Sequence, residues 1–84
     1  MSAGKSRHWK ESDVQEAIAK MKEEPGLWPE IEHTERTTGD FRDTDTGKRE
    51  RQILARLHPD CTLLEITDLY VAVRKHRRSE LGLK

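Results

Sequence analysis

The residues of this chain whose side chains occur most often at functional sites lie together at positions 58 to 61. His58, Pro59 and Asp60 are followed directly by Cys61, the only cysteine in the sequence. An imidazole and a thiol three residues apart supply two of the roughly four ligands that a zinc ion needs. The other histidines are too distant in the sequence to be assigned to the same site, so we predict no metal site. A single cysteine also excludes an internal disulfide.

The remaining polar residues do not form a recognisable catalytic pattern. The sequence has no glycine-rich phosphate-binding loop and no nucleophile with an evident base partner. Asp40, Asp43 and Asp45 are close together, but they do not match the full pattern of a calcium-binding loop. We therefore predict a protein that is not an enzyme and that uses no cofactor.

The composition is that of one small domain. The chain has 84 residues, of which 32% are hydrophobic and 38% are charged. A chain of this size buries only about 60% of the surface that its unfolded form exposes, so its core must be small. We expect a flexible N-terminal arm at residues 1–10 and a single small helical domain at residues 11–84. No apolar run is long enough to span a membrane, so we expect a cytoplasmic protein without membrane contact.

The charges cancel overall but are unevenly placed. The 16 basic and 16 acidic residues give a formal net charge of +0, so no global field attracts nucleic acid or membrane. Residues 25–47 contain six acidic and two basic residues, whereas residues 48–84 contain nine basic and five acidic ones. The chain therefore has an acidic middle and a basic C-terminal third.

Three segments have the periodicity of amphipathic helices, at residues 12–23, 48–57 and 62–78. The first and the third begin with capping boxes, Ser12 with Gln15 and Thr62 with Glu65. We predict a mainly α fold, a small three-helix domain. Its second and third helices form an antiparallel hairpin, and the first packs on that hairpin. Between the first two helices, residues 30–46 are compatible with either an acidic loop or a short β-hairpin.

The third predicted helix has an unusually wide apolar surface. Leu64 and Val71, seven residues apart, form a second ridge beside its main apolar face. A helix with so wide a stripe packs on two sides, either on the first two helices together or also on a partner molecule. For the second case, we predict that Leu64 and Val71 mediate self-association into a homodimer. The main face consists of Leu63, Ile66, Leu69, Tyr70 and Val73.

The same helix ends in a basic cluster that suggests an alternative function. Cations at this position can bind phosphates without reading the base sequence. A helix-turn-helix motif fits poorly, because the early turns that should face the bases contain Leu63, Leu64 and Ile66. The alternative is a small nucleic-acid-binding regulator whose contacts are Arg74, Lys75, Arg77 and Arg78.

The run from Arg51 to Asp60 resembles the end of the second helix of a J-domain, the co-chaperone module that stimulates a heat-shock ATPase chaperone. In that family a basic helix leads into a His-Pro-Asp loop, and an apolar third helix packs back antiparallel. The resemblance covers about Lys48 to Arg78. It departs from the family in that only Cys61 separates Asp60 from the cap of the next helix. The resemblance implies that the turn contacts the chaperone, aided by Arg51 and Arg56.

The favoured function is that of a small non-enzymatic protein-interaction module, an adaptor or regulator. The polarised charge and the over-wide apolar face of the last helix support it. Its partner is another protein, and the J-domain resemblance suggests a chaperone-type one. The predicted contact residues are His58, Pro59, Asp60, Lys48, Arg51 and Arg56.

Overall fold

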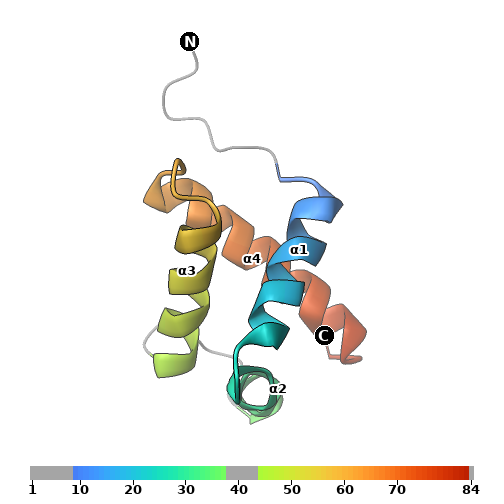
Figure 1. Cartoon of the computed structure of the whole chain (residues 1–84). Helices are drawn as coiled ribbons and strands as arrows, with labels where there is room; N and C mark the ends of the chain where they lie inside the picture. The colour runs from blue at the N-terminus through green and yellow to red at the C-terminus, as the bar shows by residue number, and fades with distance from the viewer. Residues whose placement is uncertain (1–8, 38–43, 84) are drawn as a thin grey trace.

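The computed structural model describes residues 9–37 and 44–83, and these residues form four α-helices (Figure 1). The helices are α1 (Glu11–Glu23), α2 (Leu27–Thr37), α3 (Asp45–Leu57) and α4 (Leu63–Glu80). The described residues contain no strand. The prediction of a mainly α fold is therefore confirmed. Residues 1–8 of the predicted arm lie outside the described residues.

The longest helix, α4, packs against both α1 and α3. In Figure 1, α1 and α3 run side by side in opposite directions, and α4 crosses behind both of them. The consecutive helices α3 and α4 pack against each other as predicted, with α4 returning obliquely. The remaining helix, α2, lies at one end of the molecule, where it contacts α1 and α3.

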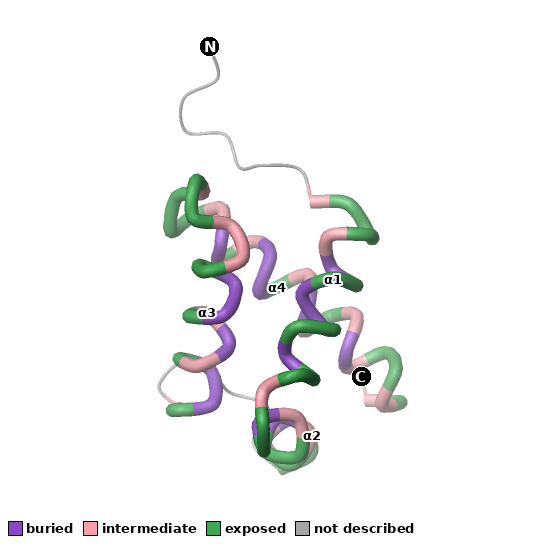
Figure 2. Tube along the Cα trace, viewed as in Figure 1, coloured by how far each residue is buried: buried purple, intermediate pink, exposed green. Residues whose placement is uncertain are grey.

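All four helices contribute side chains to one hydrophobic core. Figure 2 shows buried positions along the inner side of each helix and exposed positions along the outer side. Among the members of the main apolar face predicted for α4, only Leu63 is exposed. The buried hydrophobic residues are Val14, Ala17, Ile18, Met21, Leu27, Ile31, Ile53, Leu54, Ile66, Leu69, Tyr70 and Val73.

The acidic middle of the chain differs from the prediction. Residues 30–37 belong to the helix α2 and form neither a loop nor a β-hairpin, so the described residues contain four helices and not three. Leu27, Ile31 and Glu35 recur at every fourth residue and are all buried, as the period of a helix requires. Pro29 is tolerated because it lies in the first turn, where its missing N–H has no helical partner. Residues 38–43 lie outside the described residues.

The first helix begins one residue earlier than predicted, and Ser12 is not its cap. The N-cap residue is Lys10, whose backbone N–H donates to Oδ2 of Asp13 at 3.0 Å. A carboxylate in the first turn is also stabilised by the positive end of the helix dipole. Asp13 therefore fixes the start of α1.

The capping box predicted for the last helix is confirmed. Oγ1 of Thr62 accepts from the N–H of Glu65 at 3.2 Å, and Oε1 of Glu65 accepts from the N–H of Thr62 at 2.8 Å. At the other end, Gly82 has a φ of 75°, and the N–H of Leu83 donates to the carbonyl of Arg78 at 2.8 Å. This is a Schellman ending, which favours glycine at the left-handed position. Both ends of α4 are thus fixed by local chemistry.

Candidate functional site

The His58-Pro59-Asp60 tripeptide forms the turn between α3 and α4. The N–H of Cys61 donates to the carbonyl of His58 at 3.1 Å, which closes a four-residue turn. Proline favours this conformation because its φ is already fixed. Pro59 and Asp60 are exposed. Two of the three predicted contact residues of the turn are therefore accessible to a partner.

The third, His58, packs inward against the N-terminal segment. Its ring meets the indole of Trp9 edge-on, with 4.9 Å between the centroids and 61° between the planes. The Nε1–H of Trp9 donates to the carbonyl of Glu65 at 2.9 Å, which holds the indole over the turn. Nε2 of His58 is buried and has no hydrogen-bond partner among the described residues. The histidine ring thus serves the packing of the turn in this conformation.

The cations predicted on α3 lie on two different sides of that helix. Arg51 faces α4, and its guanidinium lies 5.5 Å from the ring centroid of Tyr70. Arg56 is exposed and lines a depression on the α1 side, together with Lys20 and Glu23. Lys48 is exposed one turn before Arg51. The structure therefore places Arg51 beside α4 and Arg56 on the α1 side of the helix.

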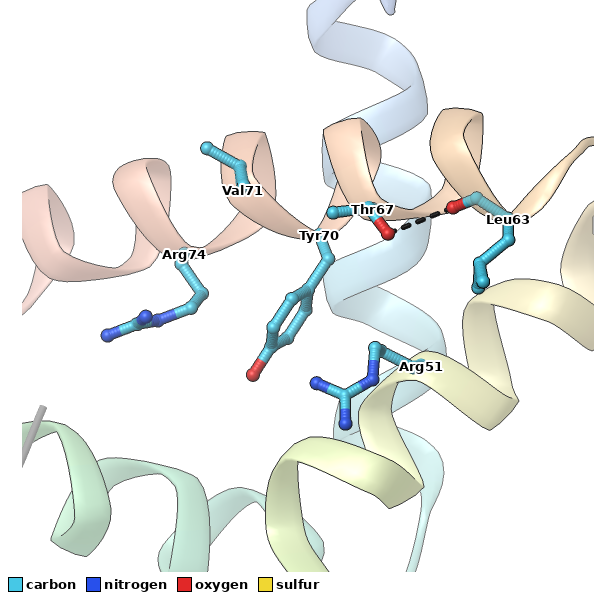
Figure 3. A pocket seen from close by; sticks show the side chains of 6 residues that line it. All are labelled: Arg51, Leu63, Thr67, Tyr70, Val71 and Arg74. Atoms are coloured by element: carbon cyan, nitrogen blue, oxygen red, sulfur yellow. Dashed lines mark hydrogen bonds between the residues drawn. The ribbon is translucent and has the colours of Figure 1, made fainter. Parts of the chain in front are cut away.

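A surface groove lies between α3 and α4, with a volume of about 470 Å³ (Figure 3). Its apolar lining comes from α4, and an arginine from each helix borders it. Leu63 and Val71, at opposite ends of this lining, are 78% and 59% exposed, and Leu64 beside them is 54% exposed. The groove residues are Arg51, Leu63, Thr67, Tyr70, Val71 and Arg74.

The basic cluster at the end of α4, the predicted nucleic-acid contact, is largely engaged in contacts within the molecule. Arg77 has no exposed side-chain surface, so it cannot reach a phosphate in this conformation. Nη2 of Arg74 and Nη1 of Arg78 lie 3.2 and 2.9 Å from Oε1 of Glu35. Of the four predicted residues, Lys75 is the one that is exposed.

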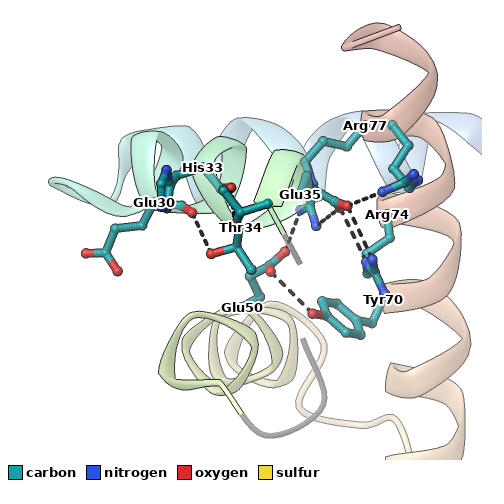
Figure 4. Close-up of polar contacts among 10 residues, drawn as sticks. Glu30, His33, Thr34, Glu35, Glu50, Tyr70, Arg74 and Arg77 are labelled. Atoms are coloured by element: carbon teal, nitrogen blue, oxygen red, sulfur yellow. Dashed lines mark hydrogen bonds and ion pairs between the residues drawn. The ribbon is translucent and has the colours of Figure 1, made fainter. Parts of the chain in front are cut away.

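A buried polar network joins α2, α3 and α4 (Figure 4). Nη2 of Arg77 donates to Oε2 of Glu35 at 2.7 Å, and its Nη1 donates to Oε1 of Glu50 at 2.6 Å. The hydroxyl of Tyr70 donates to Oε2 of Glu50 at 3.3 Å. The carboxylates and the guanidinium of this network have no exposed side-chain surface, so it cannot bind a ligand without opening. We assign it a structural role.

The environment shifts the pKa values of the network in different directions. Burial alone would raise the pKa of Glu35, but hydrogen bonds from Arg74, Arg77 and Arg78 outweigh it and hold the pKa below its usual value. Burial raises the pKa of Glu50, and the contacts with Arg77 compensate only in part. Burial and the neighbouring Glu50 carboxylate raise the pKa of Tyr70 as well.

Sequence reasoning missed Glu35 and Glu50, because buried carboxylates look like surface residues in a hydropathy pattern. The available signal was spacing. Glu35 lies four residues after Ile31, and Glu50 lies three residues before Ile53 on the buried side of its helix. Acids at core positions need buried cations, and Arg77 lies four residues after Val73 on the core side of α4.

The described residues offer neither a metal-ligand cluster nor a membrane-spanning helix. Within residues 9–37 and 44–83, no group of three or more histidine, cysteine or acidic side chains could hold a metal ion. None of the helices described has the length and apolar character needed to cross a membrane.

Comparison with known proteins gives no relative. No family model, curated protein or solved structure matches this chain. The resemblance to the J-domain therefore stays a prediction, which these comparisons neither support nor contradict.

Proposed function

We propose that this protein is a small non-enzymatic interaction module, an adaptor or regulator, that binds another protein through one surface of α3 and α4. We call this surface the docking face. It consists of the groove, Leu64 next to Leu63 on α4, and the exposed tip of the turn at Pro59 and Asp60.

The observation that supports the proposal most strongly is the exposure of aliphatic side chains on this face. Leu63, Leu64 and Val71 are the large hydrophobic residues that are exposed within the described chain, and all three lie on the first half of α4. The chain has few hydrophobic residues, and exposing three large ones together costs solvation free energy. Grouped apolar side chains on a polar surface commonly mark a site of association.

The surroundings of these side chains also suit a protein partner. Arg51 and Tyr70 lie in contact at the groove, and arginine and tyrosine are enriched at the centres of protein interfaces. Arg51 can contribute apolar contact area at this position, whereas the hydroxyl of Tyr70 donates within the protein to Glu50. The docking face therefore combines an apolar centre with a polar edge, as protein interfaces generally do.

Affinity capture from native lysate tests this proposal. The tagged protein is compared with Val71→Asp and with Ala19→Asp, a control that adds the same charge at an exposed position of α1. After nuclease treatment, we expect the wild type and Ala19→Asp to retain a common protein partner and Val71→Asp to lose it. If all three proteins capture the same set, the docking face is not the binding surface.

The J-domain resemblance supplies a narrower version of the proposal, in which the partner is a heat-shock ATPase chaperone. Asp60 is the suitable residue for testing it, because it is exposed and Asp60→Asn leaves the packing of His58 on Trp9 intact. In this version the wild type stimulates the ATPase and Asp60→Asn does not. Absence of stimulation by the wild type would reject the chaperone as partner and leave the general proposal in place.

A further inference from the structure

We infer that the indole of Trp9 is an autoinhibitory lid over His58, and that a partner reaches the ring of this histidine only when the indole moves away. We call this side chain the Trp9 lid. The inference rests on the proposed function, because the tip of the turn belongs to the docking face, and it specifies how access to that tip is controlled.

The lid joins two distant parts of the chain. Trp9 lies ahead of α1, whereas His58 is the C-cap residue of α3 and Glu65 lies in the first turn of α4. Figure 1 shows the start of α1 and the turn between α3 and α4 at the same end of the molecule. The indole N–H donates to the Glu65 carbonyl at 2.9 Å, and the centroids of the indole and the His58 ring are 4.9 Å apart. One side chain from the N-terminal segment therefore covers the turn.

The ring of His58 has an unused hydrogen-bonding atom. Its Nε2 is buried and has no hydrogen-bond partner among the described residues. The backbone of the same residue is satisfied, because its N–H donates to Leu54 at 3.0 Å and its carbonyl accepts from Cys61 at 3.1 Å. A buried polar atom without a partner is uncommon and costs free energy. The closed conformation therefore withholds a hydrogen bond that the ring gains when it meets water or a partner.

The covered ring adjoins surface that a partner can already reach. Pro59 and Asp60 follow His58 directly and are exposed. When a partner is seated on this tip, movement of the indole extends the contact to the third side chain of the turn. An imidazole nitrogen donates or accepts a hydrogen bond according to its protonation, and a hydroxyl or an amide can serve either state. The partner group expected at His58 is therefore a hydroxyl or an amide.

The lid can move while the helices stay intact. The helix α1 begins at Glu11, and its start is fixed by the contact between Lys10 and Asp13, in which the indole takes no part. Trp9 itself is half-buried and packs against the hydrophobic core, which favours the closed position. Peripheral segments open locally at a lower free energy than the whole domain unfolds. If only the open form binds the partner, the apparent affinity falls by the fraction of molecules that are open.

Diethyl pyrocarbonate tests the lid without any partner, because it modifies imidazole nitrogens that solvent can reach. The modification rate of each histidine is followed by mass spectrometry, with the exposed His33 as the internal reference. We expect His58 to react more slowly than His33 in the wild type. Trp9→Ala should accelerate the reaction of His58 by at least about tenfold, since a minor open form makes up at most about 10% of the molecules.

Trp28→Ala is the matched control for the loss of an indole. Trp28 is half-buried on α2, and its ring centroid lies 4.9 Å from Nζ of Lys22. Its removal takes away packing elsewhere than at the turn, so His58 should keep the wild-type rate. Trp9→Phe retains a ring but not the donor, and it should give an intermediate rate. Circular dichroism establishes that each variant is folded.

The link to the partner is tested by titrating each tagged variant into nuclease-treated lysate and measuring the concentration that recovers half of the captured partner. Trp9→Ala should reach half recovery at a concentration about tenfold lower than the wild type, because the cost of opening is removed. His58→Phe keeps an aromatic ring against the indole but lacks the ring nitrogens, so it should need a higher concentration. Trp28→Ala should match the wild type.

Three results would overturn the inference: equal His58 rates in the wild type and Trp9→Ala, equal acceleration by Trp28→Ala and Trp9→Ala, or half recovery that stays unchanged in Trp9→Ala or in His58→Phe. These results are separable from failure of the proposed function. If Val71→Asp loses the partner while recovery is independent of Trp9 and His58, the lid is rejected and the function stands. If no variant captures a protein, both proposals fail.

Discussion

Nη1 of Arg77 donates a hydrogen bond to Oε1 of Glu50 at 2.6 Å, and neither side chain has any surface in contact with solvent. The same guanidinium binds Glu35, so a single residue of α4 joins α2 and α3. Burying these charges is costly, and it is offset only while all partners are in place. The network therefore makes the position of α2 depend on α4.

Removing Arg77 tests this dependence. Arg77→Met leaves the buried carboxylate of Glu50 with Tyr70 as its remaining partner in the network, whereas Glu35 keeps Arg74 and Arg78. We expect the free energy of unfolding to fall by about 3–5 kcal/mol, as measured by urea denaturation. Glu50→Gln in the same background should restore part of this loss, because it removes the unpaired charge. If the double variant were no more stable than Arg77→Met, the unpaired charge of Glu50 would not be the cause of the lost stability.

The pH dependence of stability tests the role of Glu35. Its pKa is lower in the folded state than its ordinary value of 4.5, so it stabilises the protein above pH 4.5. This contribution is lost as the pH falls from 4.5 through the lowered pKa. Glu50 contributes to the pH dependence of stability with the opposite sign, because its pKa is raised in the folded state. We expect the unfolding free energy of the wild type to fall more steeply on acidification than that of Glu35→Gln. If the unfolding free energies of the wild type and Glu35→Gln changed in parallel with pH, the stabilising role of the Glu35 carboxylate would be contradicted.

The packing of the N-terminal segment on the turn is a third testable feature. Trp9→Phe keeps an aromatic ring beside His58 but removes the donor to the Glu65 carbonyl. We expect a loss of about 1 kcal/mol of unfolding free energy, the usual contribution of one hydrogen bond. Trp9→Ala should cost more, because the ring is lost as well. Urea denaturation followed by circular dichroism measures both. Equal stability of wild type and Trp9→Ala would show that the indole does not hold the turn.

The connection between α1 and α2 depends on one glycine. Gly26 has a φ of 73°, in the left-handed region, and a Cβ added there would meet no atom within 4 Å. Gly26→Ala therefore tests backbone strain without a steric clash, and we expect it to cost about 1–2 kcal/mol. Gly26→Asn should cost less, since asparagine tolerates this conformation better. Thermal unfolding compares the two variants. If Gly26→Ala were as stable as the wild type, position 26 would impose no backbone strain on a residue with a Cβ.

The sequence predicted the elements whose signals are local. The capping box of Thr62 and Glu65 fixed the start of α4, and the helical fold class followed from the apolar periodicity of the chain. The helix α2 was not predicted, because one of its three buried positions is Glu35. The burial of the Glu35 carboxylate is compensated by arginines about 40 residues later in the chain. The apolar periodicity within a short window of sequence contains no information about such distant partners.

The candidate site was predictable to a similar extent. The seven-residue spacing of Leu64 and Val71 indicated a second apolar ridge, and both side chains are indeed exposed. Whether they associate with another copy stays a prediction. The sequence did not separate Arg51 from Arg56, because their directions depend on where α1 and α4 pack on α3. It also placed Arg77 on the surface, since a basic residue near the end of a helix usually is exposed.

The central claim, that another protein docks on this face, is tested most directly by site-specific photo-crosslinking. A photoreactive phenylalanine analogue replaces Val71 in one version and Ala19, on the exposed side of α1, in another. Both are irradiated in nuclease-treated native lysate. We predict that position 71 crosslinks to a distinct protein and that position 19 does not. Crosslinks from position 71 only to this chain itself, or the same products from both positions, would contradict the claim.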